Sequence, residues 1–177
     1  GISEAFVKEG AEVVILDLKF SEELKKRKNL VLIKCDVTHD YSVSNAFRKI
    51  CEIFGGVDIL VSNAGAAWQG EIGTVNLKLL RKSFELNFWS HQRVAQAAIK
   101  IMTLQKTGGC LLFNTSKQAI NPGRNFGPYG LPKAATLFLM KQYALDYGDH
   151  KIRSNAVNAD RVRTGILTDK MIKARSK

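Results

Sequence analysis

Short apolar runs alternate along the chain with longer segments in which apolar residues recur at helical spacing. The runs are rich in β-branched residues and nearly continuously apolar, as expected of strands buried on both faces of a parallel sheet. Such runs lie at residues 11–17, 30–37, 57–65, 109–116 and 151–158. The alternation predicts an α/β fold with a parallel sheet.

The segments between these runs are predicted to be helices. Residues 42–55 carry one apolar stripe, and residues 76–105 form a long helical segment that we expect to break near Asn87. Gly10 is expected to end the opening helix, because glycine readily adopts the left-handed conformation that follows a last turn. There is no internal repeat, low-complexity tract or linker-like change of composition, so we expect residues 1–177 to form one domain.

The composition is that of an ordinary globular protein, with 45% hydrophobic and 24% charged residues. No apolar run approaches the ~20 residues needed to span a membrane, and no basic stretch followed by an apolar one marks a signal peptide. The three cysteines, Cys35, Cys51 and Cys110, fit no metal motif. We expect free thiols, no bound metal and a reducing, cytoplasmic location.

The charge balance is strongly basic, with a formal net charge of +11. Such an excess is compatible with nucleic-acid binding. Much of it, however, lies in residues 24–29 and 169–177, and no aromatic residue interleaves with the basic run to provide a stacking surface for bases. We therefore interpret these segments as solvated and do not expect a nucleic-acid partner.

A second pattern concerns chemistry at the start of the last long helix. Tyr129 follows Ser116 by thirteen residues, and Lys133 follows Tyr129 by four. Residues four apart share a helix face, so the ammonium is expected beside the phenol. A neighbouring positive charge lowers the pKa of a phenol and makes it a better general base. Pro132 is expected in the first turn of this helix, where a missing N–H costs little.

These residues resemble the catalytic set of the short-chain dehydrogenase/reductase family, and the resemblance covers essentially the whole chain. "SNAG" (62–65) is similar to the family's Asn-Asn-Ala-Gly, and "CDVT" (35–38) to its Asp-Val. The family implies a Rossmann-like, doubly wound parallel sheet and hydride transfer to or from a nicotinamide cofactor. It also adds Asn87, in "ELNFW", to the catalytic set.

The resemblance implies a role for each member of this set. Tyr129 would exchange a proton with the substrate oxygen, and Ser116 would hydrogen-bond the same oxygen. Lys133 would tune Tyr129 and hold the nicotinamide ribose, and Asn87 would anchor a water. His39, His91 and His150 match no family role, and we expect them at the surface or in local hydrogen bonds.

Asp17 bears on the choice of cofactor, because it ends the second family strand. A carboxylate at this place accepts hydrogen bonds from the ribose hydroxyls and repels a 2′-phosphate. It favours NAD over NADP, although Lys19 could reach a phosphate. Asp36 is either an adenine contact or a turn and cap residue. The cofactor-binding residues expected from the family are Gly1, Ile2, Asp17, Asp36, Val37, Asn63, Ala64, Gly65, Tyr129, Lys133, Val162 and Thr164.

The sequence departs from the family pattern in two places. Only the last three positions of the glycine-rich phosphate loop are matched, with Ser3 in place of a glycine, and the first and last family strands have no counterpart. We therefore expect a gap at the centre of the sheet and a chain that is part of a longer one. Later, Ala159 and Asp160 replace the family's Pro-Gly ahead of Thr164.

The segment "NADRVRTGIL" (158–167) is similar to the dehydrogenase part of bifunctional aldolase/short-chain dehydrogenases. We expect a small polar alcohol, aldehyde or ketone as substrate, and a homodimer or homotetramer. Alternatives are a 3-oxoacyl-carrier-protein reductase that uses NADPH, and a non-catalytic relative that binds a nucleotide or RNA. Loop residues that could line the substrate pocket are Trp68, Gln118, Asn125 and Phe126.

Overall fold

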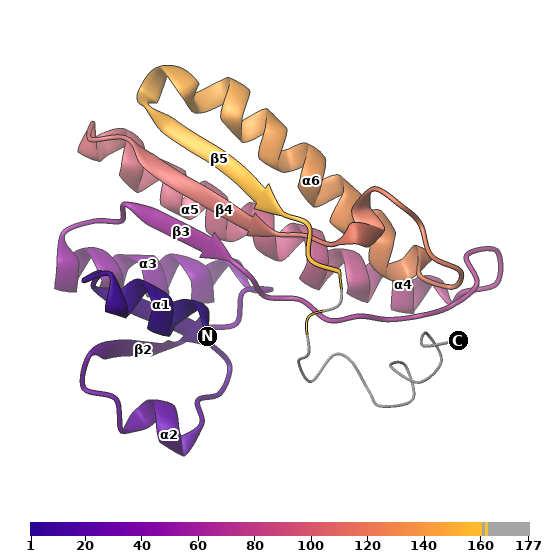
Figure 1. Ribbon diagram of the computed structural model, residues 1–177, viewed down its shortest axis with the longest axis horizontal. Coiled ribbons are helices and arrows are strands. Elements are labelled where there is room, and N and C mark those ends of the chain that lie inside the picture. Colours follow the sequence, from indigo (N-terminus) through magenta and orange to yellow (C-terminus); the bar gives the residue numbers. More distant parts are fainter. Residues whose placement is uncertain (161, 163–177) are drawn as a thin grey trace.

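The computed structural model describes residues 1–160 and 162, and within them the predicted α/β architecture is confirmed (Figure 1). The strands form two sheets, and every pairing is parallel. The smaller sheet pairs β1 (Val13–Asp17) with β2 (Leu30–Lys34). The larger sheet has the order β3 (Ile59–Ser62), β4 (Gly109–Asn114), β5 (Ile152–Val157). Each strand coincides with one of the apolar runs in the sequence.

Helices connect the strands, as parallel pairing requires. They are α1 (Ile2–Lys8), α2 (Glu22–Lys25), α3 (Asp40–Phe54), α4 (Leu77–Phe84), α5 (Ser90–Gln105) and α6 (Gly127–Tyr147), with short 3₁₀ turns η2 (Lys117–Ala119) and η3 (Gly148–His150). Gly10 follows α1 with a φ of 84°, as predicted for the residue that ends this helix. Helices α3, α5 and α6 lie over one face of the sheets, and α1 lies on the opposite side (Figure 1).

The core lies between the strands and the helices of that first face. Phe47 and Ile50 of α3, Met102 of α5, and Leu111 and Phe113 of β4 are all buried. Tyr143 of α6 completes this layer, with its ring stacked on that of Phe113. The apolar periodicity of the sequence therefore places the expected faces inward. No helix in the described part of the chain combines the length and the apolarity that crossing a bilayer requires.

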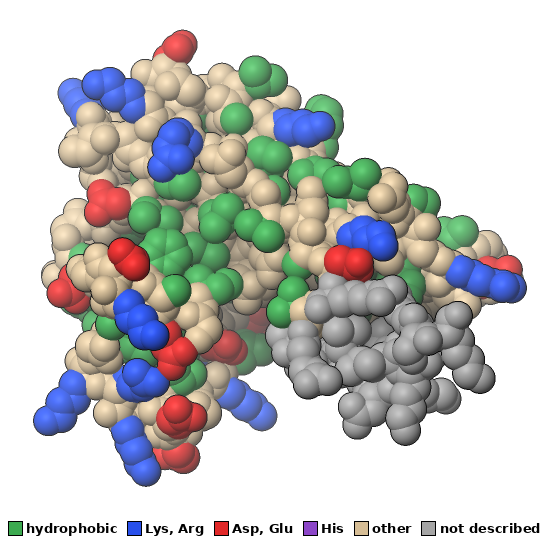
Figure 2. Space-filling model, in the orientation of Figure 1, with side chains coloured by type: hydrophobic (Ala, Val, Ile, Leu, Met, Phe, Trp, Pro, Cys, Tyr) green, Lys and Arg blue, Asp and Glu red, His purple; other side chains and the backbone are tan. Residues whose placement is uncertain are grey.

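The two sheets are separated where β1 and β3 face each other, because these neighbouring edges are unpaired. This is the central gap predicted from the sequence. A cavity runs along it, lined by apolar side chains of both edge strands, such as Val14, Leu16 and Leu60. Figure 2 shows hydrophobic side chains along this hollow, with Lys and Arg side chains projecting around the lower part of the molecule, where α2 lies. The basic residues Lys25, Lys26, Arg27 and Lys28 are exposed there, as predicted.

The predicted break near Asn87 is also present. Between α4 and α5 the backbone forms a five-residue π-helix, η1 (Glu85–Trp89), with Asn87 at its centre. A π-helix widens the turn and often marks a functional site. Its altered geometry lets the Thr136 hydroxyl of α6 donate to the Asn87 carbonyl oxygen over 2.8 Å.

The start of α6 corrects one expectation. The helix begins at Gly127, two residues before Tyr129, so Pro132 lies inside the helix and not in its first turn. Pro128 accounts for the earlier start, because the fixed φ of proline suits the first positions of a helix. Pro132 leaves the carbonyl four residues before it without a helical donor, and its ring is buried.

Candidate active site

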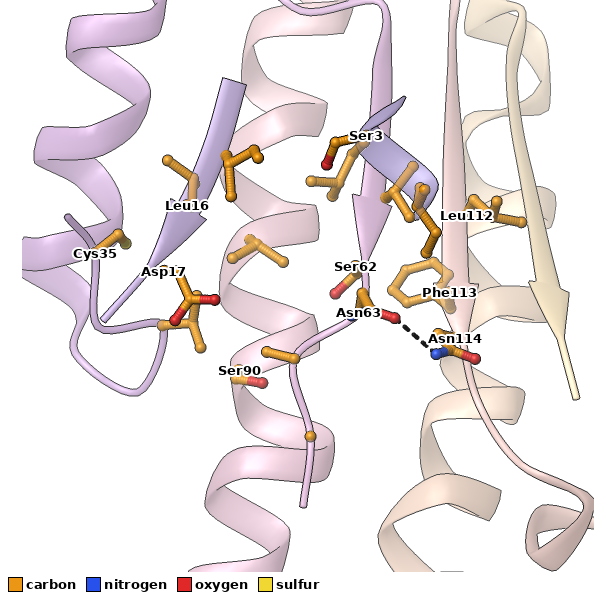
Figure 3. Close-up of a pocket in the computed structure, with 18 of the residues that line it drawn as sticks. Ser3, Leu16, Asp17, Cys35, Ser62, Asn63, Ser90, Leu112, Phe113 and Asn114 are labelled. Atoms are coloured by element: carbon orange, nitrogen blue, oxygen red, sulfur yellow. Dashed lines mark hydrogen bonds between the residues drawn. The ribbon is translucent and has the colours of Figure 1, made fainter. Parts of the chain in front are cut away.

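The cavity between the sheets ends where the strands end at their carboxyl sides. Figure 3 shows Asp17 at the end of β1 at the same end of the cavity as Asn63 and Asn114, which follow β3 and close β4. The Asn114 side chain donates to the Asn63 side-chain oxygen over 2.7 Å. In open parallel sheets, ligands bind outside the carboxyl ends of the strands. This edge is therefore the place to look for a site.

One continuous cavity of about 2180 Å³ joins most of the residues expected from the sequence. Ligand pockets commonly measure ~300–1,000 Å³, and this one is larger because it extends along the gap between the sheets. The expected residues that line it are Gly1, Ile2, Asp17, Asp36, Val37, Asn63, Ala64, Gly65, Ser116, Tyr129 and Val162. Thr164 lies outside the described residues.

Ser116 and Tyr129 meet at this cavity from two different elements. Ser116 follows β4 and is the N-cap of η2, where its hydroxyl accepts from the Gln118 N–H over 3.2 Å. Tyr129 lies in the first turn of α6. Burial raises the pKa of the Tyr129 phenol, and a hydrogen bond with Ser116 acts in the opposite direction. The net shift of the pKa is upward because burial has the largest effect on this phenol, so the lowering expected from a neighbouring ammonium does not determine it.

Lys133 is almost completely buried, with 3% of its surface exposed. Its ammonium donates to the Asn114 carbonyl oxygen over 2.9 Å and lies 5.9 Å from the centre of the Tyr129 ring. Burial lowers the pKa of Lys133 from 10.5 to about 8, since a desolvated ammonium is less stable than a neutral amine. Lys133 thus lies behind Tyr129, as the four-residue spacing predicts.

Asn87 holds the loop that follows β3. Its side-chain amide donates to the Ala66 carbonyl over 2.9 Å, and its side-chain oxygen accepts from the Ala66 N–H over 3.2 Å. The amide also donates to the Ser83 hydroxyl over 3.0 Å. Both the amide nitrogen and the side-chain oxygen of the buried Asn87 are therefore paired with protein groups.

Gly65 brings the backbone close to this group. A Cβ atom at this position would lie 2.9 Å from the Asn87 side-chain oxygen and 3.2 Å from the Lys133 Nζ. The first separation is shorter than real Cβ contacts. Only glycine therefore lets the chain pass these two side chains without displacing them.

The acidic residues differ in their availability. Asp17 is exposed, and one carboxylate oxygen accepts from the Leu18 N–H over 2.6 Å. Asp36 is tied down, because the same oxygen accepts from both the N–H and the hydroxyl of Thr38, which lowers the pKa of Asp36. Asp36 thus stabilises a turn and also lines the cavity, so the adenine contact stays a prediction, whereas Asp17 presents an exposed carboxylate to the cavity.

The residues expected to line a substrate pocket divide into two groups. Trp68, Gln118 and Phe126 line the cavity. Asn125 does not line it; it occupies a left-handed turn with a φ of 64°. The Lys82 ammonium lies 5.4 Å from the centre of the Trp68 ring, which makes this corner of the cavity positively charged.

His91 forms hydrogen bonds, one of the two roles expected for it, but the sequence did not predict that it lies inside the site. His39 and His150 are exposed, as expected, but His91 is completely buried and its Nε2 lies 3.4 Å from the Lys133 Nζ. A signal was present in the sequence, because Ser83, Asn87 and His91 recur every four residues along one helix face. A polar stripe of this kind on the buried face of a helix indicates a site that needs polar groups.

The chain was compared with protein families and with individual proteins. A family model described as "Enoyl-(Acyl carrier protein) reductase" matches residues 1–176. The chain is 31% identical over 169 residues to "Uncharacterized oxidoreductase YuxG" of Bacillus subtilis, with 90% of this chain and 24% of that protein covered. It is 30% identical over 175 residues to "Short chain aldehyde dehydrogenase 1" of Euphorbia lathyris, with 92% of this chain and 59% of that protein covered.

Solved structures share the fold. A 3-ketoacyl-(acyl-carrier-protein) reductase from Brucella melitensis, complexed with NADH, superposes with a TM-score of 0.90 at 24% identity, covering 96% of this chain and 73% of that one. At this identity the likeness concerns the fold alone. The chain spans less than two thirds of the length of the two sequence relatives above, at 24% and 59%.

Proposed function

The chain belongs to the short-chain dehydrogenase/reductase family, and from this premise we propose that it is an NAD-dependent oxidoreductase that interconverts a small alcohol and its carbonyl compound. The observation that carries the proposal is that Ser116 and Tyr129 meet at the cavity, with the Lys133 ammonium buried 5.9 Å from the centre of the Tyr129 ring. We also propose that residues 1–177 form a single nucleotide-binding domain.

The residues present fit a nicotinamide dinucleotide. Asp17 offers an exposed carboxylate for ribose hydroxyls at one side of the cavity, and Tyr129 lines the same cavity at the other. Gly65 lines the cavity too, and its lack of a side chain lets the backbone pass close to Asn87 and Lys133. When bound, the nicotinamide supplies or takes the hydride.

In the reaction, side chains of this protein would donate a proton to the substrate oxygen atom and hold that oxygen atom in place. Because burial raises the pKa of Tyr129, the phenol is protonated at neutral pH and is suited to donate its proton to a carbonyl oxygen. Ser116 would hydrogen-bond that same oxygen and hold it in line. The Lys133 ammonium would stabilise the phenolate that Tyr129 becomes once it has given up the proton.

The direct test is turnover. Wild-type protein is mixed with NADH and a panel of small aldehydes, ketones and hydroxyketones, and oxidation of NADH is followed at its absorption maximum. We expect saturable, protein-dependent oxidation with at least one carbonyl compound of this class. Absence of turnover across the panel with either NADH or NADPH, in protein shown to bind the nucleotide, would favour the non-catalytic alternative.

Cofactor choice is attributed to Asp17, which gives a second prediction. Asp17→Ser removes the charge that would repel a 2′-phosphate, so the preference for NADH over NADPH should shrink by roughly tenfold, the scale of one lost charge interaction. The measurement is the ratio of kcat/KM for the two nucleotides. Asp149→Ser, at an exposed position in η3, is the matched control and should leave the ratio unchanged.

A second candidate is a reductase of acyl groups on an acidic carrier protein. The description of the matching family model and the net charge of +11 favour it. It differs from the first candidate in cofactor and in substrate size. Faster reduction of an acyl-carrier thioester with NADPH than of any small carbonyl compound with NADH would select it.

We also propose that the protein forms a homodimer or homotetramer through α5 and α6. Large apolar side chains are exposed on these helices, with Leu104 81%, Phe138 67% and Leu145 79% accessible. Exposed apolar patches of this kind mark interaction surfaces. Light scattering should give at least twice the mass of one chain, and a single species at the mass of one chain would contradict the proposal.

A further inference from the structure

We propose that His91 is a positioning residue for Lys133: its neutral imidazole, held by Ser62, accepts a hydrogen bond from the ammonium and holds the lysine in place behind Tyr129. The inference rests on the proposed function, because it assigns His91 a task in the same site. It rests on geometry that brings together the end of β3, the start of α5 and the first turns of α6.

The contacts of the imidazole define this arrangement. The His91 Nδ1 lies 2.6 Å from the Ser62 hydroxyl oxygen, and the Nε2 lies 3.4 Å from the Lys133 Nζ. None of the surface of His91 is exposed, and the Phe113 ring lies beside it at 6.2 Å between ring centres. Both nitrogens of a fully buried ring are therefore matched to polar partners, which is not expected of a histidine that only fills space.

The partners fix the protonation of the ring. An ammonium has three donors and no acceptor, so while Lys133 is charged the Nε2 of His91 must be the acceptor. The proton then lies on Nδ1, which donates to the Ser62 hydroxyl. A charged imidazolium would set two positive charges 3.4 Å apart in a buried place, and burial together with Lys133 lowers the pKa of His91 to about 3.

The surroundings of Lys133 offer no competing charge. The groups that face its ammonium are the Asn114 carbonyl from β4, the Tyr129 ring from its own helix, the backbone at Gly65 and the His91 ring from α5. Among the described residues, no carboxylate is recorded in an ion pair with it. The charged form of Lys133 therefore depends on neutral acceptors, and His91 is one of two.

Loss of the His91 acceptor would affect both the orientation and the charge of Lys133. Two of the three N–H groups of Lys133 are used by Asn114 and His91, and the third remains on an ammonium that lies next to the Gly65 backbone. Losing the imidazole acceptor frees the ammonium to turn and removes a group that stabilises its charge. We expect a weaker hold on the nucleotide ribose and a lower pKa of Lys133.

The test uses two substitutions that differ in which ring nitrogen they imitate. The amide of His91→Gln reaches about as far as Nε2 and can still accept from Lys133, whereas the shorter amide of His91→Asn can replace only the contact of Nδ1 with Ser62. His150→Asn, at an exposed position, is the matched control. Ser62→Ala keeps the imidazole and removes only the partner of Nδ1.

The first readout is the pKa of Lys133, followed by NMR of the lysine side chains in the full chain, with the signal assigned by its loss in Lys133→Arg. It does not require turnover. We expect this pKa to fall in His91→Asn, to fall less in Ser62→Ala, and to stay near the wild-type value in His91→Gln and His150→Asn. Equal values in His91→Asn, His91→Gln and wild type would overturn the proposal.

The second readout is the KM for NADH in wild-type protein that turns over. We expect a rise of roughly tenfold in His91→Asn, the scale of one lost hydrogen bond to a charged group, and recovery in His91→Gln. If the wild type has no turnover, the proposed function fails while the titration of Lys133 still decides the role of His91. If both variants lose activity equally with an unchanged pKa of Lys133, His91 is only a packing residue.

Discussion

Replacing Tyr129 by phenylalanine is expected to reduce kcat by about 10²–10⁴, the range that a single general acid contributes. The substitution removes one oxygen atom and keeps the ring that packs in the first turn of α6, so NADH binding and the melting temperature should stay near wild type. The measurement pairs turnover of a carbonyl compound with a nucleotide titration. Only the proton donor is lost, and the two readouts should separate.

The control for this substitution is Tyr41→Phe, because the Tyr41 side chain is 83% exposed and lies at the start of α3. It should leave both readouts unchanged. Turnover of Tyr129→Phe within a few fold of wild type would mean that another group donates the proton. Loss of nucleotide binding in the same variant would mean that Tyr129 is a structural part of the cofactor site.

Lys133→Met is expected to lower turnover strongly without a comparable loss of stability. Turnover should fall at least ~100-fold, because no charge remains to stabilise the phenolate of Tyr129. The substitution removes the cost of burying a charge but leaves the Asn114 and His91 acceptors without a donor, so the free energy of unfolding should change by no more than about 1–3 kcal/mol. The control is Lys141→Met, an exposed position of the same helix, which should change neither property.

The pH dependence follows from the same lysine. Its folded pKa of about 8 lies below its ordinary value of 10.5, so between these values the unfolded chain holds a proton that the folded chain has released. Stability therefore gains a favourable contribution as pH rises through this window. Carbonyl reduction should decline above pH about 8, as the ammonium is lost.

These two trends can be measured directly. Denaturant unfolding at a series of pH values should give a stability that rises less steeply between pH 8 and 10 in Lys133→Met than in wild type. The pH profile of kcat/KM should have its descending limb in the same region. An identical pH slope of stability in the two proteins would show that Lys133 is not the buried titrating group.

Much of the fold could be predicted because local patterns determine it. The five strands need buried, β-branched runs, and those runs stand out between polar segments. Asn87 predicted an irregular helix, because an amide side chain in a helix interior competes for backbone hydrogen bonds. The structure has a π-helix at this position. The central gap between β1 and β3 was expected because the resemblance leaves the first family strand without a counterpart in this chain.

The features that could not be predicted depend on contacts between distant segments. The pKa of Tyr129 is set mainly by burial, which the four-residue spacing to Lys133 does not reveal. His91 meets Lys133 and Ser62 only because β3, α5 and α6 converge. Helix α6 begins at Gly127, earlier than predicted, because Pro128 suits the first turn of a helix.

The most direct test of the account is a titration of the protein with NADH and, separately, NADPH, because it requires no knowledge of the substrate. Energy transfer from Trp68 and Trp89 to the nicotinamide reports binding, and Trp68 lines the cavity itself. We expect saturable binding of both nucleotides, tighter for NADH. Absence of saturable binding of either nucleotide would contradict it.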